Sequence, residues 1–469
     1  MTQLPPEIFK AYDIRGIVGK TLTPDIVEAI GRAIGSEAAA RRQMQIVTGY
    51  DGRLSGPELA AALVRGIRKS GIHVIDIGMV TTPMVYFAAH HLHTGCGVMV
   101  TGSHNPPDYN GLKIMLAGET LSGEAIRGLR QRVENNDLFE GSGTCQRLDI
   151  AQDYIDRIVS DIRLARPMKI AVDCGNGVAG AYAGKLFRTL GCEVEELFCE
   201  VDGHFPNHHP DPSEPENLAD LIRALQRGDA EIGLAFDGDA DRLGVVTRQG
   251  NIIYADRLLM LFAADVLARQ PGATVVFDVK SSRNLDGWIG SRGGQPMIWK
   301  TGHSLMKARM KETAAALGGE LSGHLFFNDA CGGSESATKK RWYGFDDGLY
   351  AGARLLEILS RSGDPGTVLN ALPDSVSTPE QHIPMLEGEP HALIARLQQQ
   401  ADFPGATRII RIDGLRVEYP DGFGLMRASN TTPVIVLRFE ADTADALRRI
   451  QQQFREILLA ARPGLALPF

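Results

Sequence analysis

The sequence predicts an α/β protein in which three related units precede a smaller α+β domain. Its length of 469 residues is enough for about three domains of ordinary size. A plan of strand, polar turn, helix and second strand recurs three times in the first three-quarters of the chain. Roughly the last hundred residues differ, because residues 407–417 alternate apolar with polar positions, as a half-exposed antiparallel strand does. Strands that alternate with helices indicate largely parallel sheets, with function at the strand ends.

Each repeated unit opens on an apolar strand that ends in a polar turn. These first strands and their turns are expected at residues 46–53, 170–177 and 275–282. A helical pattern follows, and then a second short strand, expected at residues 73–76, 192–195 and 297–300. The third strand of each unit runs into a polar loop, and these loops contain Ser103, Asp237 and Glu320. Because residue identity between the units is slight, the repeat is one of topology.

The C-terminal part is expected to form an antiparallel sheet and one long helix. Strands are expected at residues 407–417 and 434–439, and an amphipathic helix at about residues 443–461. The segment 379–390 is expected to be a flexible connection. Proline- and glycine-rich stretches and shifts of pattern divide the chain into domains at residues 1–150, 151–254, 255–369 and 370–469.

Composition and charge exclude several classes of function. Hydrophobic residues make up 43% and charged residues 23%, proportions typical of a globular enzyme. The formal net charge of −8, without a long basic block, argues against nucleic-acid binding. No apolar run approaches the roughly 18 residues of a membrane helix, so no membrane partner is expected. An anionic substrate would need local positive charge against the overall sign.

The cysteines and the N-terminus indicate a reducing compartment. Six cysteines are present, at Cys96, Cys145, Cys174, Cys192, Cys199 and Cys331. They show neither a CxxC motif nor paired spacing, which indicates structural thiols. The N-terminal segment lacks the basic and apolar regions of a signal peptide. We therefore expect a cytoplasmic protein.

The loop at residues 101–107 follows the apolar run 97–100, so Ser103 is expected where a buried strand ends in a turn. Gly102 leaves space beside the hydroxyl, and the Asn-Pro-Pro sequence after it prevents a helix from starting. A hydroxyl on a bend held stiff by two prolines suits a nucleophile or a phosphate carrier. For this segment alone, a surface serine in an Asn-Pro turn is the alternative.

A second loop contains three carboxylates, Asp237, Asp239 and Asp241, directly after the apolar run 232–236. Carboxylates at alternate positions cannot all be buried without a counterion. They can converge on a hard divalent cation, which prefers oxygen ligands. An EF-hand would need other offsets and a closing Glu, which this loop lacks. The loop therefore indicates Mg²⁺, with an acidic surface turn as the alternative.

Two further loops offer groups that suit a phosphorylated sugar. The segment from Arg427 to Thr432 contains a guanidinium, hydroxyls and an amide, which suit a terminal phosphate. A polar hairpin loop is an equal alternative for that segment alone. Glu320 and Ser322 alternate along the chain, so they can face one ligand, and a carboxylate can hold neighbouring sugar hydroxyls. Considered singly, Glu320 is more often a solvated surface carboxylate.

Together these motifs resemble those of the α-D-phosphohexomutases, and within them the bacterial phosphomannomutase/phosphoglucomutase group. The resemblance covers essentially the whole chain, from residues 9–16 to the Arg427 loop. The family's phosphoserine, metal, sugar and phosphate loops are similar, in that order, to residues 101–113, 237–242, 319–324 and 427–432. Four such motifs in this order are highly specific. The resemblance implies three related α/β domains with mixed sheets and a C-terminal α+β domain, around a central active-site cleft.

The resemblance also implies an activity. Phosphorylated Ser103 would donate its phosphoryl group to a hexose 1- or 6-phosphate, and the resulting hexose 1,6-bisphosphate would return its other phosphate. Phosphoryl transfer needs alignment and charge neutralisation more than covalent help. Mg²⁺ would be bound by Asp237, Asp239, Asp241 and an oxygen on Ser103. Glucose 1,6-bisphosphate would act as activator and intermediate.

The same resemblance assigns roles to further residues. Ser103 is expected to work with three other catalytic residues, His104, Lys113 and Arg15. Of these, Lys113 and His104 are the expected general acid and base or their supports, and the resemblance does not settle which moves the proton. The residues expected to bind substrate are Tyr12, Arg242, Lys280, His303, Glu320, Ser322, His324, Arg427, Ser429, Asn430 and Thr431.

Several alternatives stay open at this point. Phosphoglucosamine mutases share the scaffold, but their sugar loop usually has Gln where Leu321 stands here, which disfavours an amino sugar. A catalytically silent sugar-phosphate-binding protein and a phosphatase that uses water as acceptor are the others. The sequence does not choose between glucose and mannose phosphates, which differ only at C2. The expected partners are hexose 1- and 6-phosphates, and the expected state is a monomer.

Overall fold

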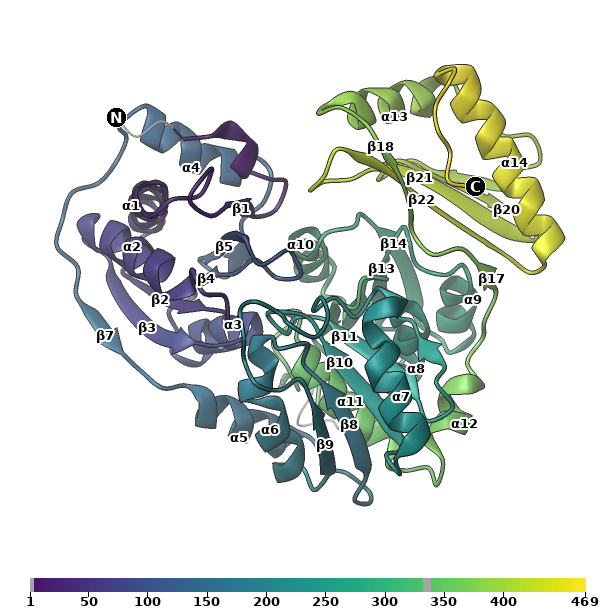
Figure 1. The fold of residues 1–469 in the computed structure, drawn as a ribbon, viewed down its shortest axis with the longest axis horizontal. Coiled ribbons are helices and arrows are strands. Elements are labelled where there is room, and N and C mark those ends of the chain that lie inside the picture. The colour runs from purple at the N-terminus through teal and green to yellow at the C-terminus, as the bar shows by residue number, and fades with distance from the viewer. Residues whose placement is uncertain (1–3, 332–338) are drawn as a thin grey trace.

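The computed structural model describes residues 4–331 and 339–469, and in these residues the chain forms four sheets (Figure 1). The first sheet lies at the left of the view, the second and third share the lower part, and the fourth stands at the upper right. Residues 1–3 lie outside the described residues. They belong to the N-terminal segment that, by its sequence, is not expected to be a signal peptide.

The first sheet is parallel from β4 to β7 and antiparallel at the edge that contains β5 and β1. Its order is β1-β5-β4-β2-β3-β7, with β6 beside β5. The strands are β1 (Ile14–Ile17), β2 (Gln45–Tyr50), β3 (His73–Met79), β4 (Gly97–Val100), β5 (Tyr109–Leu116), β6 (Glu119–Thr120) and β7 (Cys145–Arg147). Its helices are η1 (Pro6–Ile8), α1 (Pro24–Ala40), α2 (Gly56–Lys69), α3 (Thr82–His91) and α4 (Glu124–Glu134). Thr23 and Thr81 cap α1 and α3, each just before a proline-containing first turn.

The second sheet has the order β12-β11-β10-β8-β9. Its strands are β8 (Lys169–Asp173), β9 (Glu193–Leu197), β10 (Ile232–Phe236), β11 (Leu243–Thr247) and β12 (Ile252–Ile253). Its helices are α5 (Ala151–Asp161), η2 (Val178–Ala181), α6 (Ala183–Thr189), η3 (Pro215–Leu218) and α7 (Ala219–Arg227). All residues of β10 are buried, as expected for a central strand with an unbroken apolar sequence.

The third sheet has the order β14-β13-β15-β16. Its strands are β13 (Thr274–Asp278), β14 (Gln295–Trp299), β15 (Leu317–Gly319) and β16 (Leu325–Phe327). The helices along this part of the chain are α8 (Ala255–Arg269), α9 (Asn284–Ser291), α10 (His303–Thr313), α11 (Gly348–Leu359) and α12 (Pro365–Asn370). Asp347 caps α11 by accepting a hydrogen bond from the backbone N–H of Tyr350.

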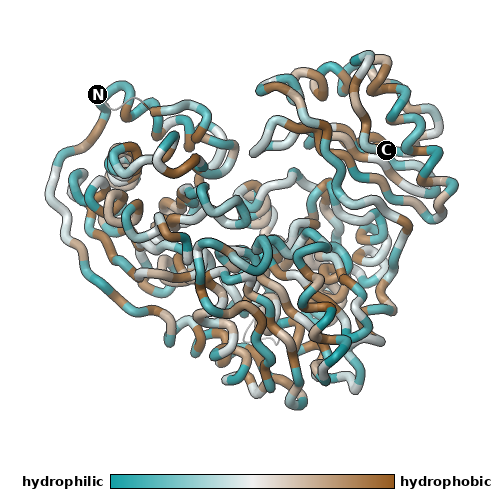
Figure 2. Tube along the Cα trace, in the orientation of Figure 1, coloured by the Kyte–Doolittle hydropathy of each residue, from teal (hydrophilic) through white to brown (hydrophobic). Residues whose placement is uncertain are grey.

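The fourth sheet is antiparallel, with the order β17-β22-β21-β20-β19 and β18 beside β22. Its strands are β17 (Val376–Ser377), β18 (Gln381–Pro384), β19 (Arg408–Ile410), β20 (Leu415–Tyr419), β21 (Gly422–Ala428) and β22 (Val434–Ala441). Two helices accompany it, α13 (Glu389–Gln400) and α14 (Ala444–Ala461). Along α14 the hydropathy alternates between the two colours of Figure 2, which is the pattern of an amphipathic helix.

The predicted repeat of topology is confirmed. The strand orders β3-β2-β4-β5, β9-β8-β10-β11 and β14-β13-β15-β16 are the same arrangement. In each, the first three strands are parallel and the fourth is antiparallel to the third. The sheets are therefore mixed, as the family resemblance implies, and not largely parallel, as the alternation of strands with helices indicated. Each predicted polar loop is the short connection between a third strand and its antiparallel neighbour, which places it at a carboxyl edge.

Two expectations for the C-terminal part are wrong. The strand expected over residues 407–417 is divided into β19 and β20, because the chain turns at Gly414, which has a φ of 75°. The segment 379–390 is not a free connection, because it contains β18, which pairs with β22. Within the described residues we find no helix that combines the length and apolar character needed to cross a membrane.

The hydrophobic cores show which parts are most firmly joined. The largest buried cluster includes Phe236 of the second sheet, Phe277 of the third and Phe87 of α3. The fourth sheet has its own core with α13 and α14. Its buried apolar contact with the third sheet includes a small cluster of Val279, Phe423 and Leu425. The second and third sheets thus share one core, whereas the fourth largely keeps its own.

Candidate active site

Ser103 lies in the loop between β4 and β5, in a strained and well-supported bend. Its φ of 48° is a left-handed value that residues with side chains seldom adopt. Its backbone N–H donates to Thr101 Oγ1 at 2.7 Å, and the buried Arg53 guanidinium donates to its carbonyl oxygen at 2.7 Å. Arg53 also donates to the carbonyl oxygens of Asn105, Pro106 and Tyr109. The sequence placed Arg53 only in a polar turn, yet it holds this loop in shape.

The Ser103 hydroxyl meets the three carboxylates of the loop after β10. It donates to Asp237 Oδ2 at 3.0 Å, across 134 residues of chain. Asp237, Asp239 and Asp241 are fully buried, and one ligand atom from each lies within 4.8 Å of the others. Asp239 Oδ1 is buried without a hydrogen-bond partner, and burial with the neighbouring carboxylates raises the pKa of Asp237 well above its usual value. Such a cluster fits a hard divalent cation.

Lys113 extends from β5 to the same carboxylates. Its Nζ donates to Asp239 Oδ2 at 2.7 Å and also to Asp241. Thr82, at the start of α3, donates to the same Asp239 oxygen at 2.6 Å and was not predicted. Burial disfavours a charge on Lys113, but the carboxylates outweigh it and raise its pKa well above the ordinary value. Lys113 therefore stays protonated here and offsets part of the negative charge.

His104 lies near the Ser103 hydroxyl, and Arg242 lies near the Asp237 carboxylate. His104 Nδ1 is 3.3 Å from Ser103 Oγ. Burial, with the positive charge of Arg242, lowers the pKa of His104 well below its usual value, so the imidazole is neutral at neutral pH. Arg242 Nε is 3.9 Å from Asp237 Oδ2, and its Nη1 is 3.7 Å from Asp211 Oδ1. Asp211, which the sequence did not indicate, completes this group.

His324 connects the metal-binding cluster to the predicted sugar loop. Its Nε2 is 3.2 Å from Asp241 Oδ1, and its Nδ1 is 3.0 Å from Ser322 Oγ and 3.4 Å from Glu320 Oε2. Glu320 also accepts a hydrogen bond from the backbone N–H of Gly302 at 2.5 Å, and burial raises its pKa. Glu320 is therefore buried in the site and is not the solvated surface carboxylate of the alternative interpretation.

Asp346 and Lys307 belong to the site although the sequence did not indicate them. Asp346 is buried and forms, with Asp241 and His324, a second group whose ligand atoms lie within 4.8 Å of one another. Lys307 Nζ is 2.7 Å from Asp346 Oδ1 and 3.0 Å from His303 Nδ1. Burial and the charge of Lys307 lower the pKa of His303 well below its usual value. In the sequence, Asp346 directly precedes the helix cap of α11 and cannot be told from a capping residue.

Arg15 and Tyr12 reach the site from β1 and the segment before it. Arg15 Nη1 donates to Gly102 O at 2.6 Å, beside Ser103, and Arg15 also pairs with Asp13. The Tyr12 ring packs edge-on against His303, with 5.4 Å between the ring centroids. Burial raises the pKa of Tyr12 to about 12. Arg15 thus contacts the Ser103 loop, and Tyr12 contacts His303, another predicted substrate-binding residue.

The predicted phosphate loop lies on β21 and the turn after it. Arg427 Nε donates to Asp413 Oδ2 at 3.0 Å, and the backbone N–H of Thr301 donates to the same oxygen at 3.0 Å. Ser429 Oγ accepts a hydrogen bond from the backbone N–H of Thr431 at 3.3 Å, within the loop itself. Ser429 and Asn430 are half-buried and Thr431 is exposed. The structure links this loop to the third sheet through Asp413, and not by direct contact with Ser103.

Lys280, the second residue after β13, is paired with a carboxylate in the part of the chain that forms the fourth sheet. Its Nζ donates to Glu380 Oε1 at 2.5 Å. Burial disfavours its charge, but Glu380 and Asp278 outweigh this and raise its pKa. A phosphate that bound Lys280 would therefore compete with Glu380.

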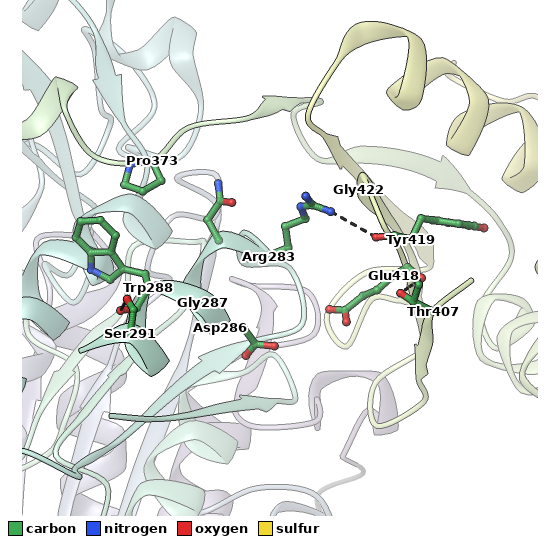
Figure 3. A pocket seen from close by; sticks show the side chains of 11 residues that line it. Arg283, Asp286, Gly287, Trp288, Ser291, Pro373, Thr407, Glu418, Tyr419 and Gly422 are labelled. Carbon is green, nitrogen blue, oxygen red and sulfur yellow. Dashed lines mark hydrogen bonds between the residues drawn. The ribbon is translucent and has the colours of Figure 1, made fainter. Parts of the chain in front are cut away.

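Two hollows lie between the part of the chain that forms the third sheet and the part that forms the fourth. One of about 450 Å³ lies beside α9 and the β20–β21 hairpin, where Arg283 donates to Tyr419 O at 3.4 Å (Figure 3). None of the predicted site residues lines it. The other, of about 510 Å³, is lined by Asn430 and Asp413 together with Lys300, Arg411 and His391. The predicted phosphate loop therefore borders a hollow that contains several basic side chains.

This fold and this site define a multidomain α/β enzyme whose strand-end loops meet around one serine hydroxyl and one metal-binding cluster. Models of phosphoglucomutase/phosphomannomutase α/β/α domains I, II and III match residues 6–140, 152–250 and 254–376, and the model of the C-terminal domain matches residues 387–457. The chain belongs to the phosphoglucomutase/phosphomannomutase family.

Individual relatives agree over the full length. The chain is 60% identical to a phosphoglucomutase of Neisseria meningitidis, with 100% of both chains covered. It is 56% identical to a phosphomannomutase/phosphoglucomutase of Pseudomonas aeruginosa, which covers 99% of this chain and 98% of that one. A crystal structure of a family protein from Burkholderia thailandensis is 55% identical and superposes with a TM-score of 0.93 over 100% of both chains. The predicted family and fold class are thereby confirmed.

Proposed function

We propose that this protein is a phosphohexomutase that moves a phosphoryl group reversibly between the 1- and 6-positions of glucose and mannose phosphates. The supporting observation is the Ser103 hydroxyl, which lies 3.0 Å from Asp237 within the carboxylate cluster of a chain of this family. We further propose that it acts as a cytoplasmic monomer, with domains at residues 1–150, 151–254, 255–369 and 370–469.

In this proposal Ser103 carries the phosphoryl group. Phosphorylated Ser103 transfers it to the free hydroxyl of a hexose phosphate, which forms a hexose 1,6-bisphosphate. The bisphosphate then reorients end for end in the site and returns its other phosphate to Ser103. Asp237, Asp239 and Asp241 would hold Mg²⁺, which supplies Lewis-acid charge neutralisation when bound. Glucose 1,6-bisphosphate serves as the activator that loads the serine.

In the proposed reaction Lys113 neutralises charge and His104 exchanges a proton. Lys113, whose pKa is raised by Asp239 and Asp241, stays protonated and neutralises charge as the phosphoryl group moves. His104 is neutral and lies 3.3 Å from Ser103 Oγ, so its imidazole can exchange a proton with that oxygen. Arg15 and Arg242 bring further positive charge to the serine loop and to Asp237.

Other residues bind the sugar and the phosphate that is not being transferred. Glu320, Ser322, His303 and His324 form the sugar side with Tyr12, while Arg427, Ser429, Asn430 and Thr431 grip the phosphate that is not being transferred. Lys280 would exchange Glu380 for that phosphate. Glu320 is proposed to hold the 3- and 4-hydroxyls, which glucose and mannose share, so it should not discriminate at C2.

Phosphorylation of the serine is the direct test. After incubation with glucose 1,6-bisphosphate, intact-mass analysis should show one phosphate on the wild type and none on Ser103→Ala. A phosphate retained on the variant would move the site to another residue. Release of inorganic phosphate in place of isomerisation would identify a phosphatase.

Substrate choice is tested separately by measuring kcat/KM for glucose 1-phosphate and mannose 1-phosphate in parallel. A site with no essential hydrogen bond to the 2-hydroxyl discriminates weakly, because strong rejection requires buried polar groups left unpaired. A preference above roughly 10⁴-fold for either sugar would contradict dual use.

A further inference from the structure

The sulfur atoms of Cys174 and Cys199 lie 3.3 Å apart, although the 25 positions that separate them in the sequence give no sign of a pair. Both are free thiols. Neither is among the residues proposed to bind substrate or to take part in phosphoryl transfer. The contact is therefore a feature that the activity leaves unexplained.

The backbone brings these two residues together at the carboxyl edge of the second sheet. Cys174 directly follows β8, and Cys199 lies two residues beyond the neighbouring parallel strand β9 (Figure 1). The N–H of Cys174 donates to Leu197 O at 3.1 Å, and the N–H of Asn176 donates to Phe198 O at 2.8 Å. Phe198 has a φ of 51°, a left-handed turn that a bulky residue seldom adopts. The two segments are thus held side by side by backbone hydrogen bonds.

The two thiols differ in access. Cys174 is fully buried, whereas Cys199 is partly exposed. The hydrogen bond between the two thiols and the burial of the sulfur together raise the pKa of Cys174 well above its usual value. A reagent from solvent therefore meets Cys199 first, and Cys174 is placed to react second.

We propose that Cys174 and Cys199 are a reversible modification site that forms a disulfide bond with small-molecule disulfides of the glutathione type. The Cys199 thiolate attacks the reagent disulfide, forms a mixed disulfide and releases one reagent thiol. The Cys174 thiolate then attacks the Cys199 sulfur and releases the second reagent thiol. Two protein thiols lose two protons and two electrons, and one reagent disulfide becomes two thiols.

The cross-link would bear on the metal-binding loop. A disulfide bond is about 2.05 Å long, so the sulfurs must approach by about 1.2 Å. The segment after Cys174 supports Gly238, since the N–H of Val178 donates to Gly238 O at 3.1 Å. On its other side, a Cβ on Gly238 would lie only 2.4 Å from Ser103 O. With so little space, a shift of the Cys174 segment moves the loop between Asp237 and Asp239, and small displacements there lower turnover.

Peptide mapping of the full-length folded protein tests the site. The protein is incubated with oxidised glutathione, free thiols are blocked with N-ethylmaleimide, and the digest is analysed by mass spectrometry without reduction. We expect a linked pair of peptides containing Cys174 and Cys199, and the separate peptides again after dithiothreitol. The matched variants are Cys199→Ser, which should give no linked pair, and Cys145→Ser, which removes an exposed thiol and should still give it. The buried Cys96 and Cys192 should stay unlinked, which excludes oxidation of unfolded chains.

Activity measured on the same samples tests the connection to the metal loop. Oxidised wild type and oxidised Cys145→Ser should lose at least about threefold in kcat and recover with dithiothreitol. Cys199→Ser should keep the same kcat with and without oxidised glutathione. Absence of the linked peptides in oxidised wild type would overturn the site. A complete cross-link with unchanged kcat would overturn its coupling to the Asp237 loop.

Discussion

The two ends of the proposed active site are built in opposite ways. At one end Ser103 is 2% exposed, the three aspartates are 0% exposed, and each hydrogen-bonds to a side chain from a distant part of the chain. At the other end Arg427 is also buried, but Ser429 and Asn430 are only half-buried and Thr431 is exposed. The side-chain hydrogen bonds of Ser429 stay within its own turn. Bond making needs reacting groups fixed to within a fraction of an ångström, whereas a phosphate grip must accept a substrate in two orientations. The difference in burial matches this difference in task.

The same contrast extends to the supporting domains. The second sheet, which supplies the aspartates, shares one continuous core with the third. The fourth sheet, which supplies Arg427, meets the third through the small Val279, Phe423 and Leu425 cluster and through polar pairs such as Lys280 with Glu380. Polar pairs of this kind can be exchanged for a substrate phosphate, but a shared apolar core cannot. The loop with the three aspartates thus stands on the largest buried apolar cluster of the described residues.

The largest effect is expected at Ser103. Ser103→Ala removes the phosphoryl acceptor and should lower kcat by at least about 10³-fold, because nucleophile removal leaves only binding and charge stabilisation. KM should change little, since the sugar and phosphate contacts remain. Steady-state assays with glucose 1-phosphate and trace glucose 1,6-bisphosphate measure both constants. Ser429→Ala, which removes a hydroxyl at the other end, is the matched control and should retain most of kcat. A Ser103→Ala enzyme within tenfold of wild type would break the comparison.

Removal of the metal is expected to be next in size. EDTA should abolish turnover and Mg²⁺ should restore it. Without a dication, the negative charges of the three buried carboxylates and of the phosphoryl group would repel one another. Asp239→Asn should lose on the order of 10²-fold in kcat and respond weakly to added Mg²⁺. Asp413→Asn changes the carboxylate that Arg427 contacts, so it should keep the normal Mg²⁺ dependence. Full activity in metal-free buffer would show that the cluster holds no catalytic metal.

The extent to which the sequence predicted this site follows from how local each feature is. Ser103, Asp237 and Glu320 were predictable because each polar loop directly follows a buried strand, and the repeated strand order brings the three loops to carboxyl edges. Asp346 and Arg53 were not, because in the sequence one resembles a helix cap and the other a polar turn. Their roles exist only once α11 lies beside His324 and β2 ends beside the serine loop.

The same limit explains the errors in the fold. The alternation over residues 407–417 continues through Gly414, so the pattern alone gave no reason to divide the strand. The turn there places Asp413 against Arg427 and Thr301, which is a tertiary requirement. Likewise, Cys174 and Cys199 meet because β8 and β9 are neighbours, and strand pairing of this kind cannot be derived from spacing.

A moderate effect on binding is expected at Arg427. Arg427→Ala should raise KM by roughly 10- to 100-fold, since hydrogen bonds to a charged partner contribute about 1.5–3 kcal/mol. The kcat at saturating substrate should fall much less, because Ser103 and the aspartates are untouched. The variant should also depend more on added glucose 1,6-bisphosphate, as the intermediate escapes more often. Arg427→Lys keeps the positive charge but loses the two-pronged guanidinium, so its KM should lie between those of the wild type and Arg427→Ala. A fall in kcat with unchanged KM would place Arg427 at the transfer end.

The smallest effect is expected in the overall shape. The part of the chain that forms the fourth sheet is joined to the part that forms the third by the Val279 cluster and by exchangeable pairs such as Lys280 with Glu380. Bound substrate phosphate should therefore draw the fourth sheet and its loops toward Ser103. For a chain of 469 residues the radius of gyration should be about 23 Å, and closure should reduce it by less than about 1 Å. Small-angle scattering with saturating glucose 1,6-bisphosphate measures this change. Arg427→Ala, which weakens the grip, should contract less at the same ligand concentration. If the radius stays constant and crystals with and without ligand show the same domain positions, the phosphate loop is as fixed as the serine loop, and its exposure needs another explanation.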